Sequence, residues 1–404
     1  MKIVHVDETF HPSFGYQINS LAKYQRMEGN EVWILTTDEK HLHPAFRFAN
    51  DNDRILESDK EYQKSTGVKI IRLPVKKYIS NRAIFCMDLY KKIKQLSPDV
   101  VMLHQIETFA SIVYMLKRLY RKYPTVADSH MLRMSSGNKF AKIYNRCFRA
   151  LITPRIIRNR IPVVRTQDDD YVNSVLRIPE PLTPFISFGS DQILFHRDNT
   201  VRDNFRKENG IPENAFVVVY TGKMDEAKGG QLLADAVKRR FITKSGREVV
   251  FVIVGNTYKN AYGEKVDKTF SESENRIIRF PTQRFVDLPE FYQAADLSIF
   301  ARQCSLSFYD VQACGLPVVF EDNIINIARA SHRNGLTFEA GNADDFRNKI
   351  QFFADMSPDE YSVFSDNAVS FINGEYGYDR IAEQYTELMV KAVQRFGRKK
   401  NGNK

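Results

Sequence analysis

The sequence predicts an α/β protein with two Rossmann-like domains, each a doubly wound parallel sheet covered by helices. The chain has 404 residues, too many for one ordinary compact domain. Short β-branched apolar runs alternate with amphipathic segments, as strands and helices do in such sheets. The alternation occurs twice, and a polar stretch at 186–200 separates the two series.

The first series contains apolar runs that are nearly uninterrupted, as expected of parallel strands buried on both faces. A loop at 11–15 and a helix over about 16–28 follow the first run. The strands predicted in this half are 2–6, 32–36, 68–73, 100–104, 124–127 and 162–165.

The second series repeats the pattern and ends in a helix over about 380–395, with a basic tail from residue 397 that we expect to be disordered. The predicted domains are 1–190 and 191–375, followed by a C-terminal part, 376–404, whose helix we expect to pack back on the first domain. Because open α/β sheets bind ligands at the carboxyl ends of their strands, we expect a cleft where the two sheets face each other. The strands predicted in this half are 215–220, 249–254, 277–280, 297–300 and 317–320, with helices near 229–239, 288–294 and 308–313.

Composition narrows the function classes. Four scattered cysteines with no CxxC pair argue against a disulfide scaffold or a zinc site. No apolar run is long enough to span a membrane, and the N-terminal run, broken by His5, Asp7 and Glu8, is not a signal peptide, so we expect a cytoplasmic protein. The net charge of +10 favours binding of an anionic partner, which can be nucleic acid, anionic lipid or a phosphate-bearing substrate.

The segment TGKMDEAKGG, 221–230, joins a predicted strand to a predicted helix. Gly222 lets the backbone approach a ligand, the helix N-terminus offers N–H groups to an anion, and Lys223 and Lys228 add two cations. This pattern indicates a diphosphate clamp. An ordinary strand–helix turn with exposed lysines remains an equally good explanation of this segment alone.

The segment SLSFYDVQACGLPVV, 305–319, places Asp310 in the first turn of a short predicted helix. A carboxylate there can accept hydrogen bonds from the vicinal hydroxyls of a ribose. The alternative is an acid that stabilises the helix dipole, with Gly315 as the C-cap and Pro317 as the stop.

These segments resemble the family-4 glycosyltransferases of GT-B fold. GKMDEAKGG, FVIVGN, LPEFYQAADLSIF, DVQACGLPVV and NGLTFEAGNADDF occur in the family's order. The first half is similar to the family through KIVHVDETFHPSFGYQ, PDVVMLHQ, DSH and FGSDQILF. The resemblance implies a retaining transferase that moves a sugar from a nucleoside diphosphate, which we expect to be UDP, to a glycan or lipid-linked acceptor of a cell-surface polysaccharide. It also implies that domain 1–190 binds the acceptor and that domain 191–375 binds the nucleotide sugar.

The resemblance also implies roles for residues of the second domain. Lys223 and Lys228 hold the donor diphosphate, although the family usually has Arg at the first position. The family needs no metal and no cofactor besides the donor, and its leaving phosphate is thought to take the acceptor's proton. Other donor-binding residues implied are Gly222, Gly255, Asn256, Pro281, Thr282, Ser305 and Leu306.

The main departure from the family is a pair of glutamates eight positions apart, which this chain replaces with Arg302 and Asp310. Asp310 can still accept hydroxyls, but Arg302 reverses the charge and can only donate. In one interpretation, Arg302 binds an anionic donor sugar such as a uronic acid. In the other, which we favour, Arg302 pairs with Asp310 or another acid and the sugar is recognised elsewhere.

In the first domain, the family's glycine loop, whose backbone N–H groups reach the sugar-phosphate of the donor, falls on Gly15. Tyr16 and Gln17 follow it as acceptor-binding residues. His130 ends a predicted strand, where the family has a histidine that contacts donor or acceptor. His104, at the end of the preceding strand, is a competitor, and His5 is expected to be buried structure. The implied catalytic set is therefore His130, Lys223, Lys228 and Asp310.

The region 116–160 carries many Lys and Arg residues and one acid, Asp128. Phe140, Ile143, Tyr144, Phe148 and Leu151 recur at helical spacing. A basic amphipathic helix is typical of proteins that bind membrane surfaces, which would place the enzyme at the inner membrane face. The alternative is a core-facing helix with a solvated basic face. Nucleic-acid binding is not expected, because no such module occurs.

Two further hypotheses stay open. The chain could be a GT-B enzyme acting on a soluble or small-molecule acceptor. It could also be a non-catalytic relative that binds nucleotide sugar, as the charge reversal at Arg302 suggests.

Overall fold

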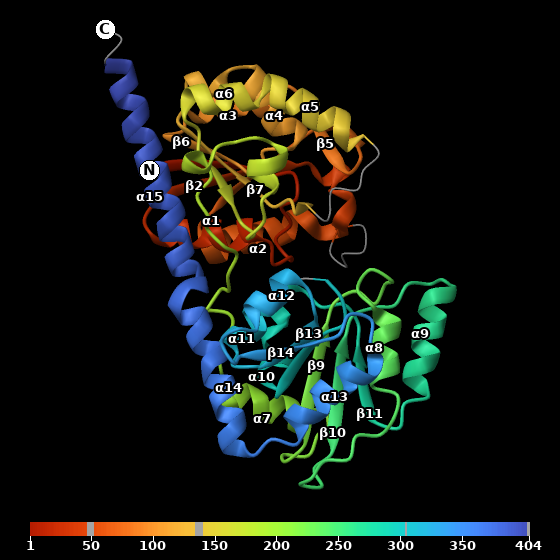
Figure 1. Cartoon of the computed structure of the whole chain (residues 1–404). Helices are drawn as coiled ribbons and strands as arrows, with labels where there is room; N and C mark the ends of the chain where they lie inside the picture. Colours follow the sequence, from red (N-terminus) through yellow and green to blue (C-terminus); the bar gives the residue numbers. More distant parts are fainter. Residues whose placement is uncertain (47–51, 134–139, 304, 402–404) are drawn as a thin grey trace. The chain divides into compact units, whose positions relative to one another are not determined.

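The computed structural model describes residues 1–46, 52–133, 140–303 and 305–401. The chain forms two compact units: unit 1 is Met1–Phe188 with Tyr378–Lys404, and unit 2 is Gly189–Gly377. The predicted domain limits, after residues 190 and 375, lie next to these boundaries. Each unit is described by itself (Figure 1).

Unit 1 is built on a six-stranded parallel sheet of order β3-β2-β1-β6-β7-β8. At the centre of the sheet, β1 pairs with β2 and β6, so that His5 of β1 lies opposite Ile34 of β2 and Met102 of β6. The strands are β1 (Lys2–Val6), β2 (Glu31–Thr37), β3 (Lys69–Leu73), β6 (Val100–Leu103), β7 (Thr125–Ser129) and β8 (Val163–Arg165). A separate antiparallel hairpin, β4 (Val75–Ile79) and β5 (Arg82–Phe85), was not predicted from the sequence.

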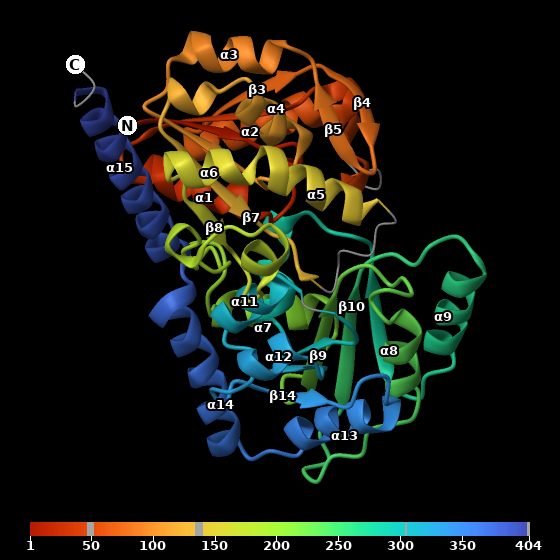
Figure 2. The same cartoon turned by 45° about the horizontal axis from the view of Figure 1, so that its top comes forward.

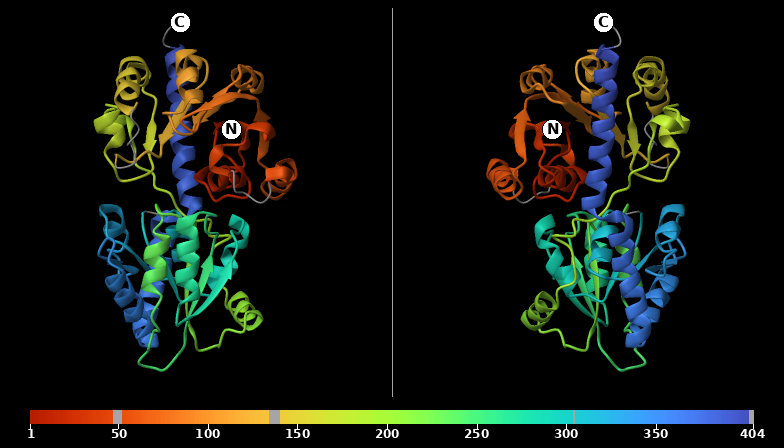
Figure 3. Two further views of the ribbon diagram at one scale, coloured as in Figure 1. Left: turned by 90° about the vertical axis from the view of Figure 1, so that its right-hand side faces the viewer. Right: turned by 90° about the vertical axis from the view of Figure 1, so that its left-hand side faces the viewer.

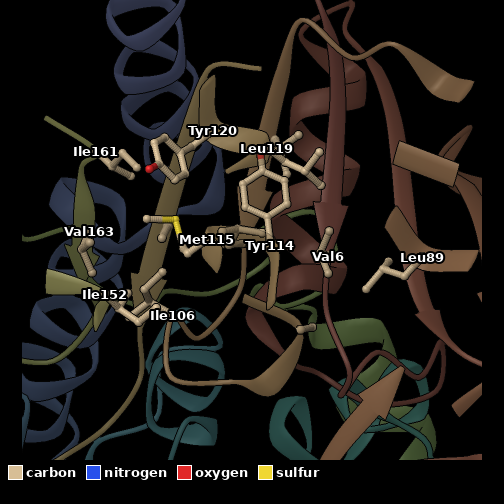
Figure 4. Close-up of a cluster of buried hydrophobic side chains, with 14 of the residues drawn as sticks. Val6, Leu89, Ile106, Tyr114, Met115, Leu119, Tyr120, Ile152, Ile161 and Val163 are labelled. Carbon is tan, nitrogen blue, oxygen red and sulfur yellow. The ribbon is translucent and has the colours of Figure 1, made fainter. Parts of the chain in front are cut away.

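Helices cover both faces of this sheet because alternate residues of each strand point to opposite sides. On one face, Val4 and Val6 belong to a cluster with α3 (Asp88–Leu96), α4 (Phe109–Leu116), α5 (Ala141–Leu151) and α6 (Thr153–Asn159). Figure 4 shows part of this cluster, including Val6, Tyr114 and Val163. On the other face, Ile3 packs with α1 (Gln17–Met27) and α15 (Tyr378–Asn401), which lie side by side, and α2 (Ile55–Thr66) covers the β2–β3 side.

The long helix α15 returns to unit 1 and completes its core (Figures 1 and 3). Tyr385 and Met389 of α15 are completely buried in the cluster that contains Ile3. Packing of this helix on the first domain was predicted. The predicted disorder from residue 397 is wrong as far as Asn401, because the helix continues to that residue.

Unit 2 repeats the architecture with a parallel sheet of order β11-β10-β9-β12-β13-β14. Its strands are β9 (Phe216–Thr221), β10 (Val249–Val254), β11 (Arg276–Phe280), β12 (Leu297–Phe300), β13 (Val318–Glu321) and β14 (Gly335–Phe338). Strand β14 was not predicted, since its four residues offer only two large apolar side chains as a signal.

Helices flank the second sheet as they do the first (Figure 2). One face buries Val218, Phe251 and Ile299 against α8 (Gly230–Ala236), α9 (Ala261–Ser271) and α13 (Ala343–Ala354). The remaining helices are α7 (Asn199–Glu208), α10 (Pro289–Gln293), α11 (Ser307–Ala313), α12 (Ile324–Arg329) and α14 (Pro358–Phe371).

Both sheets have the strand order of a doubly wound fold, 3-2-1-4-5-6, once the hairpin β4–β5 is set aside. The order reverses between β1 and β6 in unit 1 and between β9 and β12 in unit 2. Ligands of such sheets bind beyond the carboxyl ends of the strands at this reversal point. The residues that follow β1, β6, β9 and β12 are therefore the first candidates for function.

Candidate functional site

In unit 2, the loop after β9 and the residues after β12 meet at the reversal point. The loop contains Lys223 and Lys228, and Arg302 follows β12. Arg302 Nη1 donates to the carbonyl oxygen of Glu226 at 3.3 Å. A Cβ atom on Gly229 would lie 2.9 Å from Cγ of Arg302, so the arginine packs directly on the loop. Two lysines and one arginine thus belong to one edge of the sheet.

Glycines bring two neighbouring turns into contact at the same edge. Gly222 has φ +149° and Gly255 has φ +139°, values that side chains rarely allow. A Cβ atom on Gly255 would lie 2.0 Å from the carbonyl oxygen of Gly222. Both positions were predicted as donor-binding, and the structure gives each a conformational reason to be glycine.

The start of α8 offers fewer free N–H groups than the sequence suggested. The Gly230 N–H donates to the Asp225 carbonyl at 3.2 Å, and the Gln231 N–H donates to the Tyr262 hydroxyl at 2.9 Å. The Lys228 N–H donates to the Asp225 carboxylate at 2.8 Å. Attraction of an anion to this loop would therefore come from the side chains of the cations more than from the helix end.

A cavity of about 760 Å³ lies beside these turns, beyond the carboxyl ends of β10 and β11. Gly255, Asn256 and Pro281, three of the predicted donor residues, line it. Thr282 is exposed next to Pro281. The cavity has the volume of small-ligand sites, which run from about 300 to 1,000 Å³.

The structure separates Arg302 from Asp310. Arg302 is 45% exposed, and its acid partner is Glu321, 3.8 Å from Nε to Oε1, rather than Asp310. Asp310 is buried and accepts a 2.8 Å hydrogen bond from the Ser190 hydroxyl. Burial raises the pKa of Asp310 well above its usual value. Recognition of ribose by Asp310 remains a prediction, and it would require the buried carboxyl group to become accessible to the ligand.

Ser305 and Leu306 lie in the turn that leads into α11, and both are half-buried. The carbonyl oxygen of Ser305 accepts a 3.1 Å hydrogen bond from Arg329 Nη1, and its hydroxyl accepts from the Ser307 N–H. This turn follows Arg302 by three residues, at the same edge of the sheet.

In unit 1, four polar side chains form a buried chain at the carboxyl ends of β1, β6 and β7. His5 Nδ1 lies 2.9 Å from His104 Nε2, and His104 Nδ1 lies 2.9 Å from Asp128 Oδ2. His130 Nε2 lies 3.3 Å from the same Asp128 oxygen. His5 is buried, as predicted. Direct acceptor contact by His104 was also predicted and is wrong, because its side chain is fully buried and both ring nitrogens have protein partners.

A hydrogen bond made by Thr386 of α15 determines which nitrogen of His5 carries a hydrogen. The Thr386 hydroxyl donates to Glu28 Oε2 at 2.6 Å, so its oxygen is an acceptor for Gln25 Nε2 at 3.5 Å. This orients the Gln25 amide and directs its Oε1 to His5 Nε2 at 2.9 Å. His5 Nε2 must therefore carry the hydrogen.

A neutral His5 then has an unprotonated Nδ1, which requires His104 to donate through Nε2. His104 Nδ1 also faces an acceptor, the Asp128 carboxylate, so His104 donates from both nitrogens and is a cation. Burial lowers the pKa of His104, but the Asp128 charge outweighs it and the pKa is raised overall. Burial likewise opposes ionisation of Asp128, but His130 and His104 hold its pKa below the usual value.

His130 is the half-exposed end of this chain. Its Nε2 lies 2.9 Å from Gln17 Oε1, while Gln17 Nε2 donates to the Tyr385 hydroxyl at 2.9 Å. Gln17 and Asp128 therefore both accept from Nε2, and Nδ1 of a neutral His130 remains an acceptor. The histidine is 23% exposed by its side chain and packs against Phe188.

The structure treats the three residues predicted in the loop before α1, Gly15 to Gln17, differently. Gln17 is buried within unit 1, so it positions His130 instead of facing a ligand directly. Tyr16 and Gly15 are half-buried, and Tyr16 packs against Phe14 and Phe46 just before α1. Contact of Gly15 with the donor and contact of Tyr16 with an acceptor stay predictions.

Sequence reasoning missed Glu8 and Arg82 as site residues. Glu8 lies two residues after the end of β1 and is buried. Its carboxylate accepts from the Ala83 N–H at 2.9 Å and from Arg82 at 3.4 Å. Burial raises the pKa of Glu8 to about 7, against the opposing effect of Arg82. The position of Glu8 after a predicted strand could have identified it as a candidate. Arg82 could not have been identified in this way, because the hairpin that brings it to Glu8 was not predicted.

The basic region 116–160 carries two apolar stripes instead of one. Tyr144 and Phe148 face the core of unit 1, while Phe140 and Ile143 are 69% and 67% exposed. Residues 134–139 of this region lie outside the described residues. The exposed stripe on α5 and α6 comprises Phe140, Ile143, Leu151 and Ile157, with exposed Lys142, Arg146 and Arg158 beside it.

Residues 215–355 match the family model described as "Glycosyl transferases group 1". The matched residues all lie within unit 2. A curated relative is the lipopolysaccharide 1,2-N-acetylglucosaminetransferase of Salmonella typhimurium, 25% identical over 210 residues, which are 46% of this chain. The matched part spans 51% of that relative.

Solved structures of other proteins are similar in fold to nearly the whole chain. A glycosyltransferase from Rickettsia africae has a TM-score of 0.72 at 15% identity, covering 97% of this chain and 98% of that one. Anabaena HepE, solved in complex with UDP and glucose, has a TM-score of 0.70 at 17% identity, covering 97% and 100%. The chain therefore has the GT-B fold, two Rossmann-like parallel-sheet domains, as the sequence predicted.

The region that matches this family model contains the loop, the glycine contact, the 760 Å³ cavity and Arg302. All second-half site residues named from the sequence lie within residues 215–355. Among the described residues, no helix is both long and apolar enough to cross a membrane.

Proposed function

We propose that the chain is a retaining family-4 glycosyltransferase that takes its sugar from UDP. The observation that supports this most is the cavity between Gly255 and Pro281, beside the cationic loop of a glycosyl transferases group 1 domain. HepE binds UDP and glucose, and the Salmonella relative transfers N-acetylglucosamine to lipopolysaccharide. We assign this chain a UDP-sugar donor and a glycan or lipid-linked acceptor in cell-surface polysaccharide synthesis.

In this proposal, the nucleotide lies against Gly255 and Asn256, and the base faces Pro281 and Thr282. The cations of the Lys223–Lys228 loop and Arg302 stabilise the diphosphate as it leaves. Ser305, Leu306 and Asp310 complete the donor side. No metal or further cofactor is assigned, because cations neutralise the charge that develops on the diphosphate.

On the acceptor side, His130 with Tyr16 positions the incoming hydroxyl. The bond from the anomeric carbon to the diphosphate oxygen breaks as the bond to the acceptor oxygen forms on the same face. The acceptor's proton passes to the leaving phosphate, so the enzyme supplies orientation and charge stabilisation.

A panel of UDP- and other nucleotide-sugars tests the proposal, with donor binding read by thermal shift and transfer read by product analysis. Binding should raise the melting temperature with UDP-sugars. The new glycosidic bond should keep the donor's anomeric configuration in the product NMR spectrum. An inverted product would contradict retention, and a donor bound without any transfer or hydrolysis would favour the non-catalytic alternative.

We further propose that the enzyme works at the inner face of a membrane, with the exposed stripe of α5 and α6 entering the headgroup layer. An apolar strip flanked by cations is the pattern of helices that lie in an anionic interface. Phe140 and Ile143 are the deepest candidates because they are the most exposed.

Vesicle flotation separates this proposal from the alternative of a solvated basic helix. Phe140→Ser with Ile143→Ser should abolish binding to vesicles of phosphatidylcholine and phosphatidylglycerol. Lys142→Gln with Arg146→Gln should weaken it at low salt, with less loss at high salt. Because these side chains are exposed, both variants should keep the wild-type melting temperature. Flotation of both variants at the wild-type level would contradict the proposal.

A further inference from the structure

Besides the cavity already described in unit 2, a cavity of about 620 Å³ lies in unit 1. It is at the end of the sheet opposite to the chain of His5, His104, Asp128 and His130. Thr125, the first residue of β7, and Ile161, just before β8, line it. His130 follows the other end of β7. The five residues of β7 span roughly 13 Å at about 3.3 Å per step, so the cavity is distinct from the histidine chain.

Four arginines line this cavity and no carboxylate does. Arg121 comes from the turn after α4, Arg158 and Arg160 from the end of α6, and Arg395 from α15. All four are exposed, and no ion pair joins any of them to a carboxylate among the described residues. Segments more than 200 residues apart in the sequence therefore contribute like charges to one cavity.

The backbone that carries these charges is held in place. Arg160 ends α6 with φ +51°, in the left-handed region, and its carbonyl oxygen accepts a 2.8 Å hydrogen bond from Arg395 Nη1. The wall between them is aromatic and apolar: Tyr120 is buried in the core of unit 1 and lies next to Ile161 (Figure 4). Phe396 lines the same cavity.

Guanidinium groups that converge without an acid repel one another, and a bound anion removes that repulsion. Arginine binds phosphate oxygens through paired N–H donors. A phosphate monoester carries a charge of about −1.5 to −2 near neutral pH, more than one carboxylate, so it offsets more of the charge of four arginines. The volume exceeds that of one phosphate group and falls in the range of small-ligand sites.

We infer that this arginine cavity is a binding site for a phosphate-bearing ligand, separate from the donor site. The shared chemistry is a diphosphate or phosphate monoester held by several guanidinium groups. Its source is either a free phosphorylated compound or the headgroup of an anionic phospholipid, and the two are separated by experiment.

Inorganic pyrophosphate is the probe for the first measurement. Calorimetric titration uses the full chain with Lys223→Gln and Lys228→Gln, so that the unit 2 loop does not take up the probe. Adding Arg158→Gln and Arg395→Gln should weaken binding about tenfold or more. Lys60→Gln with Lys64→Gln on α2, both exposed, removes the same charge elsewhere in unit 1 and should leave the affinity unchanged.

Arg121→Gln alone provides a milder variant that should also weaken binding if the double variant fails to fold. Equal affinity of the arginine variants and the lysine control would overturn the inference, whatever the chain's transferase activity proves to be. Vesicles of phosphatidylcholine with phosphatidic acid then identify the source. Loss of vesicle binding in Arg121→Gln, which lies outside the exposed stripe of α5 and α6, with displacement by pyrophosphate, supports a lipid headgroup. Unchanged vesicle binding, together with loss of pyrophosphate binding, supports a free phosphorylated ligand.

Discussion

His104 Nδ1 lies 2.9 Å from Asp128 Oδ2, and both side chains are completely buried. The hydrogen bonds around them require His104 to be a cation, so the pair is a buried salt bridge in the sheet of unit 1. Such a pair gains little over an apolar replacement, but removal of one partner leaves an uncompensated charge.

Asp128→Asn should therefore lower the free energy of unfolding by about 3 kcal/mol near neutral pH. The raised pKa of His104 stabilises the fold below the usual histidine value and loses its effect as pH rises through the folded pKa. The lowered pKa of Asp128 stabilises the fold above the usual aspartate value and loses its effect as pH falls through the folded pKa. The deficit of the variant should be largest between these two limits.

Denaturant unfolding at several pH values measures this deficit. Asp88→Asn is a suitable control because Asp88 is exposed and its ion pair with Lys91 spans 3.6 Å at the surface. That control should change stability by less than about 0.5 kcal/mol. A similarly small change in Asp128→Asn would show that His104 is neutral in the fold.

The tautomer of His130 is the second prediction. Because Gln17 and Asp128 both accept from Nε2, the neutral ring should carry its hydrogen on Nε2 and leave Nδ1 as an acceptor. Long-range ¹⁵N–¹H correlation of the imidazole rings distinguishes the two tautomers. Gln17→Leu removes one of the two acceptors and should increase the Nδ1–H population. A neutral His130 protonated on Nδ1 in the wild-type chain would contradict the proposed role of that atom as acceptor.

Glu8 predicts a third effect, on pH dependence. Because its pKa is raised to about 7, its contribution to stability is present at low pH and is lost as pH rises toward 7. Glu8→Gln keeps the acceptor for Ala83 and cannot ionise. The variant should therefore show a flatter stability curve between about pH 4.5 and 7 in urea unfolding. An unchanged slope would mean that Glu8 titrates like an exposed carboxylate.

Periodicity and composition sufficed for most of the fold because most strands of the two sheets contain an apolar run of two or more residues, and the run 249–254 is apolar throughout. The hairpin β4–β5 escaped prediction, since its run VKKYI mixes charge with apolar residues and pairs only locally. Strand β14 was not predicted either, because its four residues include only two large apolar side chains.

The site was less predictable, because contacts between distant residues decide it. The sequence placed His104 and His130 at strand ends, but only the fold shows that His5 and Asp128 enclose the first and leave the second half-exposed. The role of Gln17 depends on Tyr385, 368 positions away. The partner of Arg302 was correctly expected to be an acid, yet Glu321 could be identified only from the structure.

Arg302 gives the fourth prediction. Since it packs on the Lys223–Lys228 loop and binds the Glu226 carbonyl, Arg302→Gln should weaken binding of UDP and of all UDP-sugars by a similar factor, about tenfold. Arg239→Gln is a matched control, because Arg239 pairs with Asp344 on the surface of the same unit. Calorimetry with UDP, UDP-glucose and UDP-glucuronic acid measures the effect. A loss confined to UDP-glucuronic acid would show instead that Arg302 binds the carboxylate of the donor sugar.

Gly255 gives the last prediction, and the chain supplies its own control. Gly255→Ala would place a Cβ atom 2.0 Å from the Gly222 carbonyl oxygen, so the loop that carries Lys223 must move. Gly246 also has a positive φ, +71°, but a Cβ atom there meets nothing within 4 Å. Gly246→Ala should cost about 1 kcal/mol of stability from backbone strain alone and leave UDP binding unchanged. Gly255→Ala should cost more and also weaken UDP binding, because strain and displacement of the loop combine. Thermal unfolding and UDP titration of the two variants separate these effects. Equal UDP affinity in both would place the nucleotide away from the contact between the two glycine turns.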